Sequence, residues 1–306
     1  MMQIIRKTNI NFVGVRQIAV TASIVLIVVG IVSVILHKGL NLSIDFAGGT
    51  LIQVKFEKPV SGDLGKIRSI VSGLNYGTPE VKTIGQAENN ELQLTVADTG
   101  KGTAVSDEIQ SILKNEYADN PFEVRKVEKV GPKIGGELRK NSIIAALLSL
   151  LVILIYIGFR FHLPFGVAAV IPLFHDVLIT LTVFSLLNRE MSLTFLAALL
   201  TIIGYSLNDT IVIFDRIREN MRTGSIKGDK FLDLVNSSIN QTLSRTLITS
   251  LTTLFVVTSL FILGSETIKD FALALMIGII VGTYSTIYIA SPVLIWWHKK
   301  WPIANK

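Results

Sequence analysis

The sequence predicts an α-helical polytopic membrane protein with six transmembrane helices and one α+β domain between the first and second helix. Three observations support this fold class. First, half of the 306 residues are hydrophobic and only 17% are charged, too few for an ordinary soluble chain of this length. Second, apolar runs of about 20 residues recur, and each is long enough to cross a ~30 Å hydrocarbon core. Third, one long polar stretch separates the first run from the others.

The apolar runs give the six expected spans. Five runs contain no Asp, Glu, Lys or Arg, and one is interrupted only by His175 and Asp176. In chain order the spans are residues 17–36, 141–159, 163–188, 191–208, 246–265 and 271–297. The first run lacks a small-residue cleavage site before a polar domain, so we expect a retained helix rather than a signal peptide.

Basic residues predict the orientation, because Lys and Arg collect in the cytoplasmic flanks of membrane spans. They precede the first span, follow the second and the fourth, and end the chain (Arg6, Lys7, Arg16, Arg160, Arg216, Arg218, Arg222, Lys227, Lys230, Lys299, Lys300 and Lys306). Both termini are therefore expected in the cytoplasm. The predicted organisation is a cytoplasmic N-terminal segment (1–16), a first transmembrane helix (17–36), an extracytoplasmic domain (37–140), transmembrane helices two to six (141–298) and a cytoplasmic tail (299–306).

The polar stretch after the first span has the pattern of a small folded domain. Its expected elements are a strand (50–56), a helix (60–75), two strands (80–84 and 91–96) joined by the turn-like segment GQAENN, a helix (103–117) and a strand (122–130). In the last strand, Phe122, Val124, Val127 and Val130 break strict alternation once. The order β-α-β-β-α-β is typical of a ferredoxin-like domain.

Asp209 is the only charged residue between Glu190 and Asp215. A carboxylate in hydrocarbon is costly and usually faces a partner or a water-filled cavity. The spacing of Thr201, Tyr205, Asn208 and Asp209 at i, i+4, i+7 and i+8 predicts one polar stripe along a helix. The fourth span is therefore expected to carry a functional site.

The fifth span offers a cation to this site. Arg245, Thr249 and Thr252 predict a second polar stripe that starts with an arginine inside the span. Movement of Arg245 toward or away from Asp209 would change whether the carboxyl group is ionised, so the pair is a candidate proton relay. Asn208 is the third candidate residue of the relay and is expected to hydrogen-bond across the interface with neighbouring helices. The alternative is a static pair that orders helix packing.

Other polar residues are candidates for a second relay, for packing or for charge pairs. His175 and Asp176 lie near the middle of the third span and, with Tyr205 and Thr249, are candidates for a secondary relay or for packing through hydrogen bonds. The end of the fourth span carries Asp215, Arg216, Arg218 and Glu219, which we expect to form i,i+4 charge pairs at the membrane boundary. In the sixth span, Gly278 and Gly282 have the spacing that allows two helices to approach closely.

The sequence argues against several functional classes. The chain has no cysteine, which excludes disulfides and thiol chemistry. We find no nucleotide-binding P-loop, no HExxH and no Cys/His metal cluster. We therefore expect no enzymatic activity, no cofactor and no bound metal, and the coupling ion is expected to be H⁺, with Na⁺ as the alternative.

Four short segments form a recognisable set. They are DFAGGT (45–50), with Asp45, Phe46, Gly48 and Gly49; GPKIGGEL (131–138); HD (175–176); and GYSLNDTIVIFDRIREN (204–220), with Gly204, Asp215 and Arg216. Together with the six-span layout, they resemble the SecF family, whose members are subunits of the bacterial protein-export machinery. The resemblance covers essentially the whole chain, and the long segment in the fourth span is the most specific match.

This resemblance implies a function and a set of partners. The SecF family belongs with the resistance-nodulation-division (RND) superfamily, so the chain is expected to be half of a twelve-helix pseudo-symmetric bundle completed by SecD. The pair is expected to use the proton motive force to help unfolded preproteins leave the SecYEG channel after SecA has pushed them in. In the family, proton passage involves residues that match Asp209 and Arg245. YajC and YidC are further expected partners, nucleic acid is not, and the expected location is the bacterial cytoplasmic (inner) membrane.

Two rival functions remain open at this point. One is a half-size RND-type exporter of small molecules or lipids. The other is a non-transporting scaffold of the Sec channel, in which Asp209 is purely structural. The substitution Asp209→Asn separates a relay from a scaffold, because it removes the charge and keeps the shape.

Overall fold

The computed structural model describes residues 8–74, 76, 79–84, 90–97, 104–160, 163–223 and 231–303. The chain divides into two compact units, one made of Met1–Asn41 with Ala145–Lys306 and the other of Leu42–Ile144. Four of the expected basic flanking residues and a tail residue (Arg6, Lys7, Lys227, Lys230 and Lys306), together with most of the segment GQAENN, lie outside the described residues.

The membrane-spanning helices make up the first unit, apart from the first part of α5, and six candidate spans confirm the predicted number. They are α1 (Arg16–Leu36), α5 (Pro132–Arg160), α6 (Leu163–Leu186), α7 (Leu193–Arg222), α8 (Phe231–Leu263) and a sixth span that runs through α9 (Glu266–Ser285), a π-helical turn η3 (Thr286–Ala290) and α10 (Ser291–Lys300). The protein is thus a multi-pass membrane protein.

Helices α7 and α8 are longer than their charge-free runs. The last turns of α7 are amphipathic, and Ile213, Phe214 and Ile217 are buried on one side of the helix while charged residues occupy the other. Burial of this apolar side continues the helix to Arg222. Arg216, Arg218 and Arg222 therefore lie on the last turns of the helix itself.

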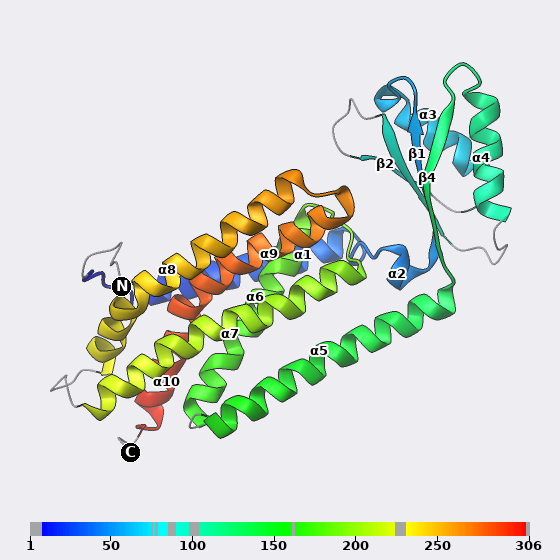
Figure 1. Ribbon diagram of the computed structural model, residues 1–306. Coiled ribbons are helices and arrows are strands. Elements are labelled where there is room, and N and C mark those ends of the chain that lie inside the picture. Colours follow the sequence, from blue (N-terminus) through cyan, green and yellow to red (C-terminus); the bar gives the residue numbers. More distant parts are fainter. Residues whose placement is uncertain are drawn as a thin grey trace. The chain divides into compact units, whose positions relative to one another are not determined.

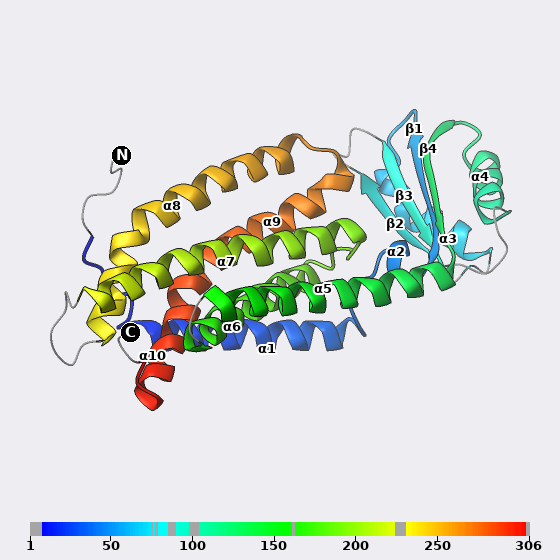
Figure 2. The same ribbon diagram turned by 60° about the horizontal axis from the view of Figure 1, so that its bottom comes forward.

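Helices α6, α7 and α9 form the centre of the bundle (Figure 1). Helix α1 packs on α6, and α8 packs on α7 and α9 (Figure 2). Glycines allow the closest approach: a Cβ atom placed on Gly278 would lie 2.2 Å from Ile202 Cγ1, and one on Gly282 would lie 3.2 Å from Ser206 Cβ. The prediction of close packing at these two glycines is confirmed, and the neighbour is α7.

Helix α5 packs much less than the other spans. Ile157 is its only buried large apolar residue, and it joins the core formed with α6. Leu147, Leu151, Ile155 and Phe159 are all at least half exposed along the rest of the helix. In a bilayer these side chains face lipid or another protein.

The Leu42–Ile144 unit contains a four-stranded antiparallel sheet of order β2-β3-β1-β4. Its elements are α2 (Ile44–Ala47), β1 (Gly49–Phe56), a 3₁₀ turn (Ser61–Asp63), α3 (Leu64–Ser72), β2 (Glu80–Ile84), β3 (Glu91–Val96), α4 (Ala104–Glu116) and β4 (Phe122–Val130). The predicted β-α-β-β-α-β order is confirmed. Ile67 and Val71 of α3 and Ile109 and Leu113 of α4 share one buried core with the sheet.

A β-bulge explains the irregular pattern of the last strand. Gln53 of β1 pairs with Lys126, but the next residue, Val54, pairs with Val124, so Arg125 is an extra residue in β4. One extra residue shifts the following side chains to the other face. This shift accounts for the break in the alternation between Val124 and Val127.

Two glycine-rich segments meet at the base of this unit. Gly48 and Gly49 have positive φ angles of 76° and 151°. A Cβ atom on Gly48 would lie 2.9 Å from Pro132 Cα, and one on Gly135 would lie 3.0 Å from the Gly48 nitrogen. The DFAGGT and GPKIGGEL segments therefore need glycine because their backbones contact each other where β4 leads into α5.

The two kinds of glycine environment predict opposite effects of one substitution. Gly278→Ala should lower the free energy of unfolding by about 1–3 kcal/mol, because the new methyl group would overlap Ile202. Gly204→Ala should be neutral or stabilising by up to about 1 kcal/mol, because no atom lies within 4 Å of its Cβ position and alanine favours helix. Unfolding in detergent, followed by circular dichroism, measures both. Equal effects at the two positions would contradict this packing.

Candidate functional site

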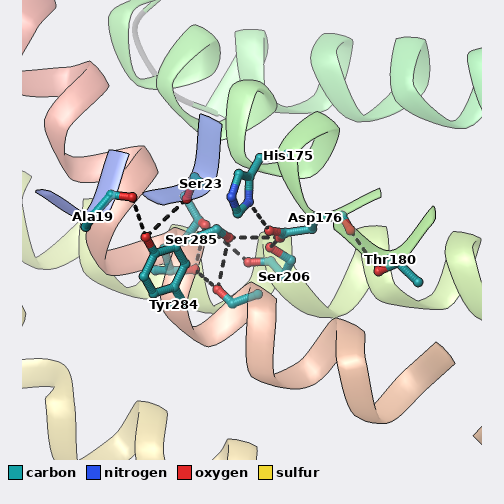
Figure 3. Close-up of polar contacts among 11 residues, drawn as sticks. Ala19, Ser23, His175, Asp176, Thr180, Ser206, Tyr284 and Ser285 are labelled. Atoms are coloured by element: carbon teal, nitrogen blue, oxygen red, sulfur yellow. Dashed lines mark hydrogen bonds and ion pairs between the residues drawn. The ribbon is translucent and has the colours of Figure 1, made fainter. Parts of the chain in front are cut away.

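The carboxyl group of Asp176 on α6 lies at the centre of a buried hydrogen-bond network among the described residues of the bundle. Asp176 is fully buried. Its Oδ1 atom is hydrogen-bonded to His175 Nδ1 at 2.9 Å, and its Oδ2 atom accepts hydrogen bonds from Ser206 Oγ at 2.5 Å and Ser285 Oγ at 2.9 Å (Figure 3). Since Ser206 lies on α7 and Ser285 on α9, this carboxyl group joins the three central helices.

The network extends from His175 to the first helix. The Tyr284 ring stacks on the His175 ring with 6.1 Å between centroids. The Tyr284 hydroxyl donates to the Ala19 carbonyl oxygen at 2.7 Å and lies 3.1 Å from Ser23 Oγ (Figure 3). His175 Nε2 is buried and has no hydrogen-bond partner among the described residues. Residues from three further helices, α1, α7 and α9, thus contribute to the network around the His175–Asp176 pair of α6.

Asp209 lies nearly one turn after Ser206 on α7 and is only 3% exposed. Its described hydrogen-bond partner is Ser250 of α8, whose Oγ atom lies 3.4 Å from Asp209 Oδ2. Ser250 Oγ lies 2.7 Å from Thr283 Oγ1 of α9. Asp209 therefore has one weak hydrogen-bond donor in a buried position, a state in which gain or loss of a proton changes the local interactions strongly.

Arg245 and Asp209 do not form a direct ion pair among the described residues. Arg245 is exposed on α8, whereas Asp209 is buried between helices. Arg245 nevertheless lies on the same helix as Ser250, the residue that contacts Asp209, and precedes it by less than two helical turns. A change in the position of the Arg245 side chain can therefore alter its electrostatic interaction with Asp209 without breaking a contact.

The predicted polar stripe of α7 divides between two faces. Asp209 faces the interior together with Ser206 and Thr210, while Thr201 and Asn208 are exposed. The hydroxyl oxygen of half-buried Tyr205 is buried and has no described partner. Adjacent residues of a helix point about 100° apart, so Asn208 cannot share the environment of Asp209.

The threonines of α8 bond to their own helix. Thr249 Oγ1 donates to the carbonyl oxygens of Arg245 at 3.1 Å and Thr246 at 2.9 Å. Thr252 makes the same type of contact, at 2.8 Å to Ile248 and 3.0 Å to Thr249. In this arrangement, neither threonine contacts Asp209.

The charged residues at the end of α7 are paired differently from the prediction. Arg216 bonds to Glu219 at 2.6 Å and Arg218 lies 3.5 Å from Asp215, so both pairs are i,i+3 rather than i,i+4. The predicted spacing was wrong because the residue four positions after Asp215 is Glu219, which carries the same charge. Asp215 also lies 3.5 Å from Arg160. These pairs are partly exposed and contribute little to stability.

Hydroxyl residues are the part of the site that sequence reasoning missed. Ser206, Ser250, Thr283 and Ser285 contact the two buried carboxyl groups directly or through one neighbour. In the sequence these residues are recognisable only as small polar residues at helical spacing. That they face the two carboxyl groups becomes visible only when the neighbouring helices are known. Among the described residues, no group of three or more His, Asp or Glu side chains could hold a metal ion.

The arrangement consists of two buried carboxyl groups whose contacts meet on one helix. Ser285 of α9 donates a hydrogen bond to Asp176, and Thr283 of α9 is linked to Asp209 through Ser250. Neither carboxyl group is in contact with a Lys or Arg side chain in the described part of the chain. Such groups in a membrane bundle are costly, and they usually bind or transfer ions.

Comparison with protein families identifies two matches. Residues 109–300 match the model described as protein export membrane protein SecD/SecF, C-terminal. Residues 33–60 match the SecD/SecF GG motif. The first match contains both buried carboxyl groups, and the second contains Gly48 and Gly49.

Individual relatives agree with these matches. The chain is 46% identical to the protein translocase subunit SecF of Calditerrivibrio nitroreducens over 284 residues, which cover 93% of this chain and 92% of the relative. It is 45% identical to the SecF of Vibrio alginolyticus over 292 residues, which cover 95% and 91%.

Solved structures give the same result. The crystal structure of SecDF from Thermus thermophilus, described as a translocon-associated membrane protein, matches with a TM-score of 0.83 and 39% identity. The match covers 95% of this chain and 39% of the SecDF chain. A second SecDF crystal structure, in a super-membrane-facing form, matches with a TM-score of 0.70 and 37% identity.

The Asp176 network predicts a position-specific effect of removing one hydroxyl group. Ser285→Ala should lower the free energy of unfolding by about 1–2 kcal/mol, because Asp176 Oδ2 loses one of its two serine donors. Ser259→Ala on α8 is the matched control, since Ser259 is exposed and bonds only to carbonyl groups of its own helix. Unfolding of the detergent-solubilised chain measures both variants. If they lose the same stability, Asp176 does not depend on Ser285.

Proposed function

Because the chain belongs to the SecD/SecF family of protein export membrane proteins, we propose that it acts as a SecF-type subunit of a protein translocase and couples ion flow to late-stage export of preproteins. The observation that carries the coupling role is Asp209, a carboxyl group that is 3% exposed and has a single weak hydrogen-bond donor in the described residues. A structural carboxylate in this position would be expected to have a full set of donors, as Asp176 has.

The coupling step depends on the charge of Asp209. With a proton bound, the carboxyl group is neutral and can remain between α7, α8 and α9. Without it, the carboxylate attracts Arg245 and needs further hydrogen bonds, which favours movement of α8 relative to α7. One proton crossing a potential of 100 mV releases about 2.3 kcal/mol, so several protons are needed for a large conformational change.

A proton is the proposed coupling ion, with sodium as the alternative. A carboxyl group binds a proton without any other ligand, whereas a sodium ion requires several oxygen atoms around it. Asp209 has only the Ser250 hydroxyl as a described neighbour of this kind. We assign no cofactor and no enzymatic activity to the chain.

SecD is the proposed main partner. This chain matches 39% of the Thermus chain, which is described as SecDF, and this match supports a SecD component as the partner. One face of α7 and one face of α8 are exposed and could pack against helices of a partner. The α7 face carries Thr201, Gly204 and Asn208, and the α8 face carries Arg245 and Thr252. The SecYEG channel, SecA acting indirectly, YajC, YidC and unfolded preprotein are the further proposed partners.

The proposed location is the bacterial cytoplasmic membrane, with both termini in the cytoplasm. The Leu42–Ile144 unit would then be an extracytoplasmic domain, and its strand order and β-α-β-β-α-β sequence support assignment to the ferredoxin-like fold. In this location the domain can contact preproteins as they leave the channel.

The proposed function predicts that export loses its dependence on the proton gradient when Asp209 or Arg245 is replaced. Asp209→Asn removes the ionisable group and keeps its shape, and Arg245→Met removes the cation. Translocation into inverted membrane vesicles, measured with and without a proton gradient, should show a loss of most of the gradient-dependent component for both variants. Asp233→Asn and Arg222→Met are matched controls, since both residues are exposed on the same two helices.

The same assay separates the rival functions. Subunit levels and association with SecD must be unchanged for the comparison to be valid. If export keeps its gradient dependence in Asp209→Asn, Asp209 is structural and the chain is a scaffold of the channel. If a sodium gradient alone, without a proton gradient, supports the gradient-dependent part of export in the wild type, sodium is the coupling ion instead of the proton. If the chain transports small molecules or lipids without SecYEG, it is a half-size exporter.

A further inference from the structure

An apolar groove of about 520 Å³ runs along the outside of the bundle between α1, α6 and the segment from η3 to α10. These elements contact one another (Figure 2). Val20 and Ile24 of α1, Ile171 and Phe174 of α6, and Val293 and Trp296 of α10 line the groove. Its volume lies within the range of roughly 300–1,000 Å³ that is usual for small-molecule sites.

The two polar residues that line the groove, Ser23 and His175, expose almost no polar atoms to it. The Ser23 hydroxyl group is engaged with Tyr284. His175 Nδ1 is engaged with Asp176, and His175 Nε2 is buried. The groove therefore presents almost no free hydrogen-bonding atoms, which suits a hydrocarbon chain and does not suit a polar solute.

The length of the groove matches one leaflet of a bilayer. Its α6 residues run from Val167 to Leu178, a distance of about 16 Å at 1.5 Å per residue. Half of a ~30 Å hydrocarbon core is about 15 Å. One acyl chain that extends from the membrane surface to the bilayer midplane would fill this length.

Two helices that line the groove carry a basic residue beyond its apolar part. On α1, Arg16 precedes Val20 by four residues and continues the same helical face. On α10, Lys300 follows Trp296 by four residues, and its Nζ atom lies 5.7 Å from the centre of the Trp296 ring. Tryptophan and lysine are common where a span meets the head-group region. Positive charge at this end favours an anionic head group.

We infer that this groove is a binding site for an anionic phospholipid of the leaflet on the side of the chain termini, with one acyl chain in the groove and its phosphate near Lys300 and Arg16. The inference does not rest on the proposed translocase function, because it uses only residues outside the Asp209 site. The occupant is a lipid because an apolar face in a bilayer is in contact with lipid unless a protein covers it.

The three tryptophans of the chain allow a direct test. Replacement of Trp297 and Trp301 by phenylalanine leaves Trp296, which lines the groove, as the single tryptophan. The full chain is reconstituted in phosphatidylcholine vesicles that contain either brominated phosphatidylglycerol or brominated phosphatidylcholine, both of which quench tryptophan fluorescence on contact. The concentration dependence of quenching gives the relative binding constant of the two lipids at Trp296.

Brominated phosphatidylglycerol should bind several-fold more tightly than brominated phosphatidylcholine. Lys300→Gln should remove most of this preference, because one basic residue near an anionic head group contributes about five-fold. Val293→Phe, which fills the groove, should also reduce it. Arg222→Gln is the matched control, since it removes one positive charge from an exposed residue of α7 away from the groove and should leave the preference unchanged.

Three results would overturn the inference. Equal quenching by the two lipids would mean that the groove holds only ordinary annular lipid. A preference for phosphatidylglycerol that survives Lys300→Gln and Val293→Phe, or that falls equally in Arg222→Gln, would come from the general surface charge. Weak quenching by both lipids would mean that protein covers the groove. Thermal unfolding identifies a variant that does not fold, and Lys300→Gln then decides the outcome alone, because Lys300 is exposed.

Discussion

The membrane bundle depends on the need to satisfy one buried carboxyl group from within the protein. Asp176 has no water in the surrounding hydrocarbon to rely on, and an unpaired polar group there costs several kcal/mol. Its donors come from α7 and α9, so these helices must approach α6 within hydrogen-bonding distance. Gly278 and Gly282 make this possible, because a side chain at either position would push α9 away from α7. The glycines of α9 and the serines of α7 and α9 are thus both needed to satisfy the hydrogen bonds of Asp176.

The same helix connects this structural centre with the proposed coupling site. Thr283 of α9 contacts Ser250, which contacts Asp209, and Ser285 of the same helix turn contacts Asp176. A change in the charge of Asp209 therefore acts, through Ser250 and Thr283, on a segment of α9 that is hydrogen-bonded to α6 two residues later, at Ser285. The π-helical turn begins directly after Ser285, and such turns have one more residue per hydrogen-bonded loop than an α-helix.

The sequence predicts the parts of this structure that follow from exclusion of charge. The six spans are recognisable because hydrocarbon excludes charged side chains, and the strands of the small unit because their apolar residues alternate. The irregular strand β4 shows the limit of this reasoning, since the extra residue Arg125 is defined only by pairing with β1. The hydroxyl donors of Asp176 could not be predicted, because a serine in a membrane helix can equally bond to its own backbone, as Ser259 does. The separation of Asn208 from Asp209 follows from helix geometry, but which of the two faces inward depends on the neighbouring helices.

The exposed residues of α7 and α8 give a physical argument for a partner inside the membrane. Asn208 lies in the middle of α7, and Arg245 lies well inside α8, yet both are exposed in this chain. An arginine or an amide that faces lipid at this depth costs free energy that protein contacts or a water-filled cavity would recover. Gly204 lies on the same exposed face and leaves room for a close neighbour, since no atom lies within 4 Å of its Cβ position. Another set of helices against this face would cover Asn208, place an interaction partner near Arg245, and enclose Asp209 between two layers of protein. Among the described residues, Asp176 has its donors whereas Arg245 has no ion-pair partner, which is the arrangement expected of a chain that packs against further helices in the membrane.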